Sequence, residues 1–350
     1  MATGIINRTL FLNTSKLSYS CTYSCVRIYS TEGPHVQPPQ PGKVKRKIYD
    51  VYLKSLQWVE RHLEIKYPKV FKVYKVFKAG TSEFIADTRT YFSVTKQIWG
   101  GQELSTFSRK QLEIYREMPE CLWTVGPVLA ISALPFANYI VFPVAYFFPR
   151  QFLSYHFWST EQKKDFALHY HSQRVAQHKP IIKGLAAKVK KIKDTDSREK
   201  LEKILQRIKA KSHPSVDEIL AASHLFQEKP LELSHISRPY MRHLAKGMLL
   251  HSLLRQKLLQ DAVLINYIDR AMQREGIDKL TEEELRSACF TRGLNATRLS
   301  KDDMIHYLTQ WTTISMEIDE TNISLLLHKP VLLAYNHPDN KSIRKALQTS

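Results

Sequence analysis

The residues that would mark a metal site or an active site occur in this sequence only in incomplete patterns. Asp194-Thr-Asp196 begins like a calcium-binding loop, but Arg198 stands at the next ligand position and the required glycine is missing. His169 and His171 are two residues apart, so on a helix they face different directions and make a poor metal-binding pair. The sequence shows no nucleophile–base pattern and no glycine-rich phosphate loop. It therefore predicts a protein that is not an enzyme and needs no cofactor.

Clustered basic residues are the second feature with chemical meaning. The chain has 52 Lys and Arg against 33 Asp and Glu, a net charge of +19. Such an excess suits contact with nucleic acid, contact with an anionic membrane, or import into an organelle. Two clusters are candidate contacts with RNA or an acidic protein, and a solvated helical face is the alternative for both. They consist of Lys188, Lys190, Lys191 and Lys193, and of Arg286, Arg292, Arg298 and Lys301.

Residues 121–149 form a long stretch without Asp, Glu, Lys, Arg or His, bounded by Glu120 and Arg150. A bilayer core about 30 Å thick needs about 20 helical residues, so the stretch predicts one transmembrane helix. Trp123 near one end and Tyr146 near the other suit the membrane–water interface. A buried core helix is the alternative, but such helices seldom run this long without a charge.

Prolines and one amide interrupt the apolar stretch. Pro127, Pro135 and Pro143 predict kinks, because proline removes a backbone hydrogen bond. We expect one bent helix; the alternative is a re-entrant hairpin, which would have short arms. Asn138 is the only strongly polar side chain there, and at that depth it should find a partner or line a cavity. Basic residues flank both ends equally, so charge does not set the orientation.

The first 29 residues have the composition of a mitochondrial transit peptide, because they are basic, rich in Ser and Thr, and free of acidic residues. Arg27, Tyr29 and Ser30 match the matrix-processing pattern in which Arg precedes a Tyr/Ser cleavage point. A disordered basic tail is the alternative. Residues 30–43 contain four prolines and predict a flexible linker.

Residues 44–120 predict a basic amphipathic helical segment. Lysine recurs at every third position from Lys69 to Lys78, with two apolar residues between each pair. The pattern indicates a helix on an anionic membrane surface, and contact with RNA is the alternative. A second helix is expected over 84–99, and a third from Ser108, which can form a capping box with Gln111.

Residues 150–350 predict a domain made only of helices. Helices are expected over 160–177, with Thr160 as the N-cap, and in the basic stretch 181–211. Ser215 and Ser300 begin further capping patterns, and so does Thr281. Residues 280–311 predict a helix–loop–helix module that resembles the SAP-type fold used on nucleic acid, although similar small folds also serve only protein contacts.

Several motifs together resemble the LETM family of mitochondrial membrane proteins, and its short branch in particular. The likeness covers residues 84–333 in matching order and spacing. The residues that carry it are Leu134-Pro-Phe-Ala-Asn-Tyr139, Phe142-Pro143, Phe148-Pro149, Pro214-Ser-Val-Asp-Glu218, Leu225-Phe226, Ser237-Arg-Pro239 and the module 280–311.

The resemblance implies a single-pass inner-membrane protein whose part after the span is a ribosome-binding-like helical domain in the matrix. Family members are linked to cation/proton exchange, mitochondrial volume control and membrane attachment of mitochondrial ribosomes. Longer members have an acidic residue where this chain has Asn138, and an amide cannot carry a proton as a carboxylate can. The chain also ends at Ser350, without the coiled coils and EF-hand of the longer members.

Two functions follow as hypotheses. The first is a non-enzymatic adaptor that binds the anionic lipid of the mitochondrial membrane and, through its helical domain, the mitochondrial ribosome or another matrix protein. It would support mitochondrial structure and respiratory function. The second is a component or regulator of mitochondrial K⁺ or Ca²⁺/proton exchange and volume homeostasis. Placement in the outer membrane is the alternative to the inner membrane, and the sequence does not reveal the oligomeric state.

Overall fold

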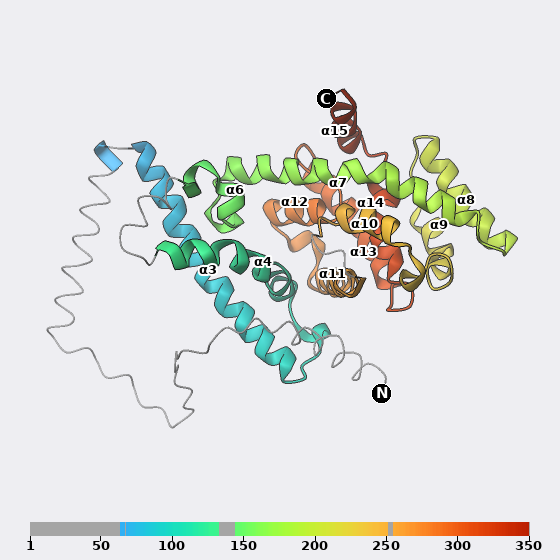
Figure 1. Ribbon diagram of the computed structural model, residues 1–350, viewed down its shortest axis with the longest axis horizontal. Coiled ribbons are helices and arrows are strands. Elements are labelled where there is room, and N and C mark those ends of the chain that lie inside the picture. Colours follow the sequence, from blue (N-terminus) through green and yellow to red (C-terminus); the bar gives the residue numbers. More distant parts are fainter. Residues whose placement is uncertain (1–63, 67, 133–143, 251–254, 350) are drawn as a thin grey trace. The chain divides into compact units, whose positions relative to one another are not determined.

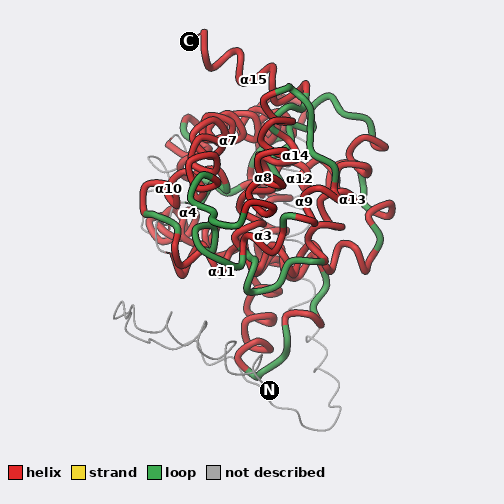
Figure 2. The backbone as a smooth tube through the Cα atoms, turned by 90° about the vertical axis from the view of Figure 1, so that its right-hand side faces the viewer, coloured by secondary structure: helices red, strands yellow, loops and turns green. Residues whose placement is uncertain are grey.

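The computed structural model describes residues 64–66, 68–132, 144–250 and 255–349, and all regular elements in these ranges are helices (Figure 2). The described residues divide into two compact units, one ending at Ala79 and one beginning at Gly80. The mostly helical fold predicted from the sequence is confirmed for this part of the chain.

The first long helices differ from the prediction in their number. α3 runs without interruption from Pro68 to Trp99, so the lysine-rich helix and the helix expected over 84–99 are one element. After the short helix η2 (Leu104–Thr106), α4 extends from Arg109 to Ser132. The predicted capping box is present, because the Ser108 backbone N–H donates to Gln111 Oε1 at 2.9 Å and the Gln111 backbone N–H donates to Ser108 Oγ at 3.3 Å.

The predicted transmembrane stretch is described only at its two ends. α4 contains residues 121–132 and continues helically through Pro127. Residues 133–143, which include Pro135, Asn138 and Pro143, lie outside the described residues, as do the predicted transit peptide, with Arg27, Tyr29 and Ser30, and the linker. α6 (Pro149–Phe152) and η3 (Tyr155–Phe157) follow. Among the described helices, none combines the length and the apolar character that a bilayer crossing requires.

α7 (Thr160–Val189) is the long helix that runs along one side of the larger unit in Figure 1. Ser159 caps it instead of the predicted Thr160, because the Ser159 side chain accepts from the backbone N–H of Gln162. The helix continues beyond residue 177 into the basic stretch 181–211, which is helical except for a break at 190–194 before α8 (Thr195–Lys209). Asp194, the first residue of the incomplete calcium loop, is the N-cap of α8.

The remaining helices complete the unit and follow the predicted caps at Ser215, Thr281 and Ser300. They are α9 (Val216–Ala221), η4 (Ser223–Phe226), η5 (Leu233–His235), α10 (Arg238–Gly247), α11 (Arg255–Glu275), η6 (Ile277–Lys279), α12 (Glu282–Thr291), α13 (Lys301–Met316), α14 (Ser324–Ala334) and α15 (Pro338–Thr349). Gly293 has φ +90°, and Leu294 after it is fully buried, as the helix–loop–helix prediction requires.

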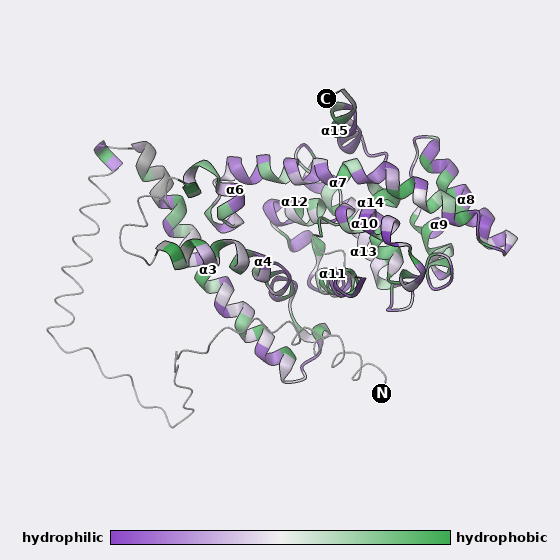
Figure 3. Ribbon diagram, viewed as in Figure 1, coloured by the Kyte–Doolittle hydropathy of each residue, from purple (hydrophilic) through white to green (hydrophobic). Residues whose placement is uncertain are grey.

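One apolar core joins α7 to the later helices. Leu185, Leu244 and Trp311, from α7, α10 and α13, are completely buried in it. A Cβ at Gly184 would collide with the Tyr240 ring, so glycine allows α7 and α10 to approach closely. Apolar residues on one side of α8 pack into the same core, and the alternation of hydrophobic and hydrophilic residues around this helix is visible in Figure 3.

Candidate functional site

The turn between α7 and α8 carries the first basic cluster. Lys190, Lys191 and Lys193 are exposed there. Lys188 is half-buried, donates from Nζ to the Pro230 carbonyl at 2.8 Å, and has a pKa lowered by burial. Three of the four predicted contact residues are therefore free to meet a partner, while the fourth also holds α7 to the loop before η5.

The second basic cluster is not a single surface. Arg298 and Lys301 are exposed near the start of α13. Arg286 is half-buried, with Nε donating to the Ala296 carbonyl at 3.2 Å and an ion pair to Glu282. Arg292 is only 2% exposed, so its prediction as a surface contact was wrong.

Arg292 faces a buried carboxylate instead. Asp269 on α11 is fully buried and accepts from Arg292 Nε at 2.8 Å and from Trp311 Nε1 at 2.8 Å. Lys329 on α14 lies 3.9 Å from the same carboxylate, and its Nζ sits 4.0 Å from the centroid of the Trp311 ring. Burial lowers the pKa of Lys329 to about 7. This charged cluster connects α11, α12, α13 and α14. No local sequence pattern predicts it, because its members are far apart in the chain.

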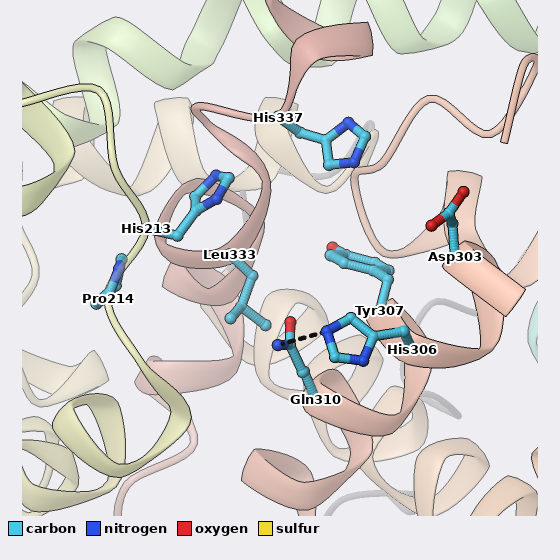
Figure 4. Close-up of a pocket in the computed structure, with 8 residues that line it drawn as sticks. All are labelled: His213, Pro214, Asp303, His306, Tyr307, Gln310, Leu333 and His337. Carbon is cyan, nitrogen blue, oxygen red and sulfur yellow. Dashed lines mark hydrogen bonds between the residues drawn. The ribbon is translucent and has the colours of Figure 1, made fainter.

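A surface pocket of about 250 Å³ lies between α13, α14 and the loop before α9 (Figure 4). Its lining comprises His213, Pro214, Asp303, His306, Tyr307, Gln310, Leu333 and His337. Figure 4 shows the three imidazole rings around the recess. His213 accepts from the Asn336 backbone N–H at 3.1 Å, and burial lowers its pKa to about 4. Nowhere in the described ranges do three His, Cys, Asp or Glu side chains group to hold a metal ion.

Large apolar side chains are exposed on both sides of the undescribed residues 133–143. Trp123, on α4, is 81% exposed, and Phe147, on the far side, is 72% exposed. Ile131, Tyr146, Phe148 and Phe152 are also exposed. Apolar patches of this kind mark contact with another apolar surface.

The two flanks of the apolar stretch are joined through α3. His156, in η3, places Nε2 3.2 Å from Asp87 Oδ2, and Ser154 Oγ lies 3.0 Å from the other ring nitrogen. These residue types form catalytic triads elsewhere, but all three are less than 10% exposed, so a substrate cannot reach them. Burial lowers the pKa of His156 although Asp87 favours its protonated form. A Cβ at Gly80 would collide with the His156 carbonyl, so glycine permits this close contact.

Apolar packing reinforces the same junction. Phe84 on α3, Val125 on α4 and Phe157 in η3 share one buried cluster with Met118 and Cys121. The Phe84 and Phe157 ring centroids are 5.9 Å apart. Phe157, which follows the apolar stretch, therefore packs against Phe84, which precedes it.

The start of α4 is attached to the later helices. Arg109 is 6% exposed; its backbone N–H donates to Glu275 Oε1 at 2.7 Å, and its guanidinium pairs with Glu113 and Glu284. Arg274 on α11 donates to the carbonyl of Phe107 at 2.7 Å. These contacts fix the segment before the apolar stretch to α11 and α12.

Comparison with known proteins gives matches over most of the chain. The family model described as "LETM1-like, RBD" matches residues 107–332. LETM1 domain-containing protein 1 of Homo sapiens is 33% identical over 283 residues, which cover 79% of this chain and 79% of the human protein. The protein of the same name from Xenopus tropicalis is 31% identical over 284 residues, 79% of this chain and 81% of its own length. No solved structure matches significantly.

Proposed function

The chain belongs to the LETM1-like family, and on that premise we propose that it is a non-enzymatic adaptor of the mitochondrial inner membrane. Its apolar stretch attaches it to the bilayer, and its helical domain binds the mitochondrial ribosome in the matrix. The composition of residues 1–29 supports import into mitochondria. The exposed aromatic residues within the apolar stretch support contact with lipid.

The observation that carries the ribosome proposal is the exposed lysine turn. Lys190, Lys191 and Lys193 project from a turn whose ends, Val189 and the helix cap Asp194, are fixed by packing and hydrogen bonding. Positive charge on a fixed backbone turn attracts the phosphates of RNA, and the backbone of the turn does not have to be ordered on binding. The description of the matching family model as an RBD agrees with this role.

The test is co-sedimentation of the full chain, in mild detergent, with mitochondrial ribosomes. Replacing Lys190, Lys191 and Lys193 together by Gln should lower the affinity roughly tenfold and flatten its salt dependence, because phosphate contacts release counterions. A matched triple variant at scattered exposed lysines should bind like the unaltered chain; its positions are Lys164, Lys246 and Lys279. Absence of binding by the unaltered chain at low salt would reject the proposal.

Cation/proton exchange stays a prediction from the family resemblance. The residue on which that hypothesis depends, Asn138, lies outside the described residues. Flux of K⁺ or Ca²⁺ against a proton gradient in proteoliposomes would support it, and Asn138→Asp should then raise the flux.

A further inference from the structure

The pocket of about 250 Å³ beside α13 and α14 has no role in the function proposed above. Pockets that bury a drug-sized ligand measure roughly 300–1,000 Å³, so this one suits a smaller molecule. Its three histidines come from distant parts of the chain, because His213 precedes α9, His306 lies on α13 and His337 lies between α14 and α15. The nitrogen atoms that these rings leave free determine the chemistry of the ligand.

Hydrogen bonds within the fold set the tautomers of two of these rings. His213 Nε2 accepts from the Asn336 backbone N–H at 3.1 Å, and His337 Nδ1 accepts from the Asp339 backbone N–H at 3.4 Å. A neutral imidazole that accepts at one nitrogen carries its hydrogen on the other. His213 therefore has a free Nδ1–H and His337 a free Nε2–H, and Figure 4 shows both rings at the edge of the recess. The pocket thus offers two hydrogen-bond donors.

The electrostatic surroundings of His213 favour an anion. Burial lowers the pKa of His213 to about 4, and the charges of His337 and Lys341 act in the same direction. Positive charge that disfavours a proton on His213 attracts a negative group to the same place. Lys341, on the first turn of α15, is half-buried and supplies a permanent positive charge.

The α13 side of the pocket has the opposite character. Asp303 lies across the recess from His213 in Figure 4, and its Oδ2 accepts from Ser300 Oγ at 2.6 Å. A carboxylate repels an anion but accepts hydrogen bonds from hydroxyl groups. Leu333 and Pro214 complete the lining with apolar surface. The lining therefore suits a small molecule with a negative group at one end and hydroxyl groups at the other.

We propose that this pocket binds the phosphate monoester group of a small molecule that also carries hydroxyl groups. His213 Nδ1–H, His337 Nε2–H and the Lys341 ammonium donate to the phosphate, and Asp303 accepts from a hydroxyl group. A phosphate monoester carries a charge of about −1.5 to −2 at pH 7 and has three strong acceptor oxygens, whereas a carboxylate carries a single charge. The pocket and the lysine turn share no residue, so phosphate binding here does not depend on ribosome binding.

Isothermal titration calorimetry of the full chain in mild detergent tests the site, with inorganic phosphate and glycerol 3-phosphate as probes at constant ionic strength. We expect one site on each chain and tighter binding of glycerol 3-phosphate, whose hydroxyl groups meet Asp303. Lys341→Gln and His337→Gln should each lower the affinity roughly tenfold. Lys279→Gln, at an exposed position on η6, is the control and should bind like the unaltered chain.

Two results would overturn the proposal. The first is the absence of saturable binding of either probe by the unaltered chain at millimolar concentrations. The second is an unchanged affinity in both Lys341→Gln and His337→Gln, whose urea midpoints show whether each variant is folded. Asp303→Asn should remove the preference for glycerol 3-phosphate over inorganic phosphate, because the amide repels the anion less and accepts more weakly from a hydroxyl group.

Sulfate, which stays a dianion between pH 7.5 and pH 5.5, tests whether the imidazoles are the binding groups. An anion beside His213 and His337 favours their protonated forms, so the affinity for sulfate should rise as the pH falls. The other charged or titratable groups that face the two rings are Asp303 and His306 on α13 and Asp339 and Lys341 on α15. His337→Gln should weaken this dependence, and a pH-independent affinity of the unaltered chain would contradict the assignment of these rings.

Competition separates two sources of the phosphate group, a soluble phosphate ester and the headgroup of phosphatidic acid. Phosphatidic acid is added to the detergent micelles, and binding of glycerol 3-phosphate is measured again. Displacement assigns the pocket to the lipid headgroup, and unchanged binding assigns it to a soluble ester; both support a phosphate site. Phosphatidylcholine, a diester, is the control, and equal displacement by this lipid would overturn the specificity for a monoester.

Discussion

Two basic clusters that look alike in the sequence have opposite places in the fold. Lys190, Lys191 and Lys193 project into solvent from a turn. In the cluster near α12, Arg292 is buried against Asp269, and Arg286 on α12 donates to the Ala296 carbonyl in the loop that follows. Arginine suits the second environment, because its planar fork donates several hydrogen bonds at once, whereas lysine presents a mobile point charge. The contrast shows that local charge density does not identify a binding surface.

The largest effect should follow from Asp269→Asn. The change leaves Arg292 and Lys329 buried without their carboxylate, and losing one partner of a buried ion pair costs about 3–5 kcal/mol. The free energy of unfolding is to be measured in mild detergent by urea titration. Arg298→Gln, at an exposed position, is the control and should change it by less than about 0.5 kcal/mol. Equal free energies of unfolding for Asp269→Asn and Arg298→Gln would show that the buried and the exposed charged residues do not differ in their contribution to stability.

Lowering the pH should lower the free energy of unfolding, whereas the exposed lysines keep their charge. Burial lowers the pKa of His171 to about 3 and that of His213 and His328 to about 4, below the ordinary value of 6.5. Between pH 6.5 and pH 4 the unfolded chain therefore binds more protons than the folded chain, and the free energy of unfolding falls as the pH falls.

Urea midpoints at pH 7.5 and pH 5 measure this loss. His328→Gln should reduce the difference between the two midpoints, because it removes one of the buried imidazoles. A pH-independent midpoint would mean that these imidazoles are not buried in their neutral form.

A smaller effect is expected from Arg286→Ala. The variant loses the hydrogen bond to the Ala296 carbonyl and the ion pair with Glu282. The hydrogen bond is the less exposed to water of the two. A loss of about 1 kcal/mol is expected in the same urea titration. If the affinity for the ribosome fell while the free energy of unfolding stayed constant, Arg286 would be a binding residue, as the exposed lysines are proposed to be.

The smallest effect should come from the double variant Arg298→Gln, Lys301→Gln. Both residues are exposed, so stability should not change. Affinity for the ribosome should fall roughly threefold if their charges add to those of the lysine turn. An unchanged affinity would confine the binding surface to the turn between α7 and α8.

The features predicted correctly from the sequence are those that depend on neighbouring residues. The capping boxes at Ser215 and Thr281 require only a second residue three positions later, so the sequence identifies them. The pairing of Arg292 with Asp269 and of His156 with Asp87 joins residues 23 and 69 positions apart. No local pattern encodes such pairs, and this is why Arg292 was expected on the surface.

The prediction of one membrane crossing rests on local sequence alone, and it stays a prediction because residues 133–143 lie outside the described residues. Hydropathy measures the length of residues 121–149, and that length is sufficient for a transmembrane helix. Hydropathy does not report which residues the two flanks of this stretch contact. Only the fold shows that Asp87 meets His156 and that Arg109 meets Glu275.

The apolar cluster that holds Val125 also packs against Leu153, so the two ends of the intervening segment are neighbours. A short Gly/Ser connection in place of residues 127–148 keeps the Pro149 carbonyl that accepts from Trp158 Nε1, and it should leave Asp87, His156, Arg109 and Glu275 in their present contacts. The melting temperature of such a shortened chain, compared with that of the unaltered chain, would measure how much these contacts depend on the apolar stretch.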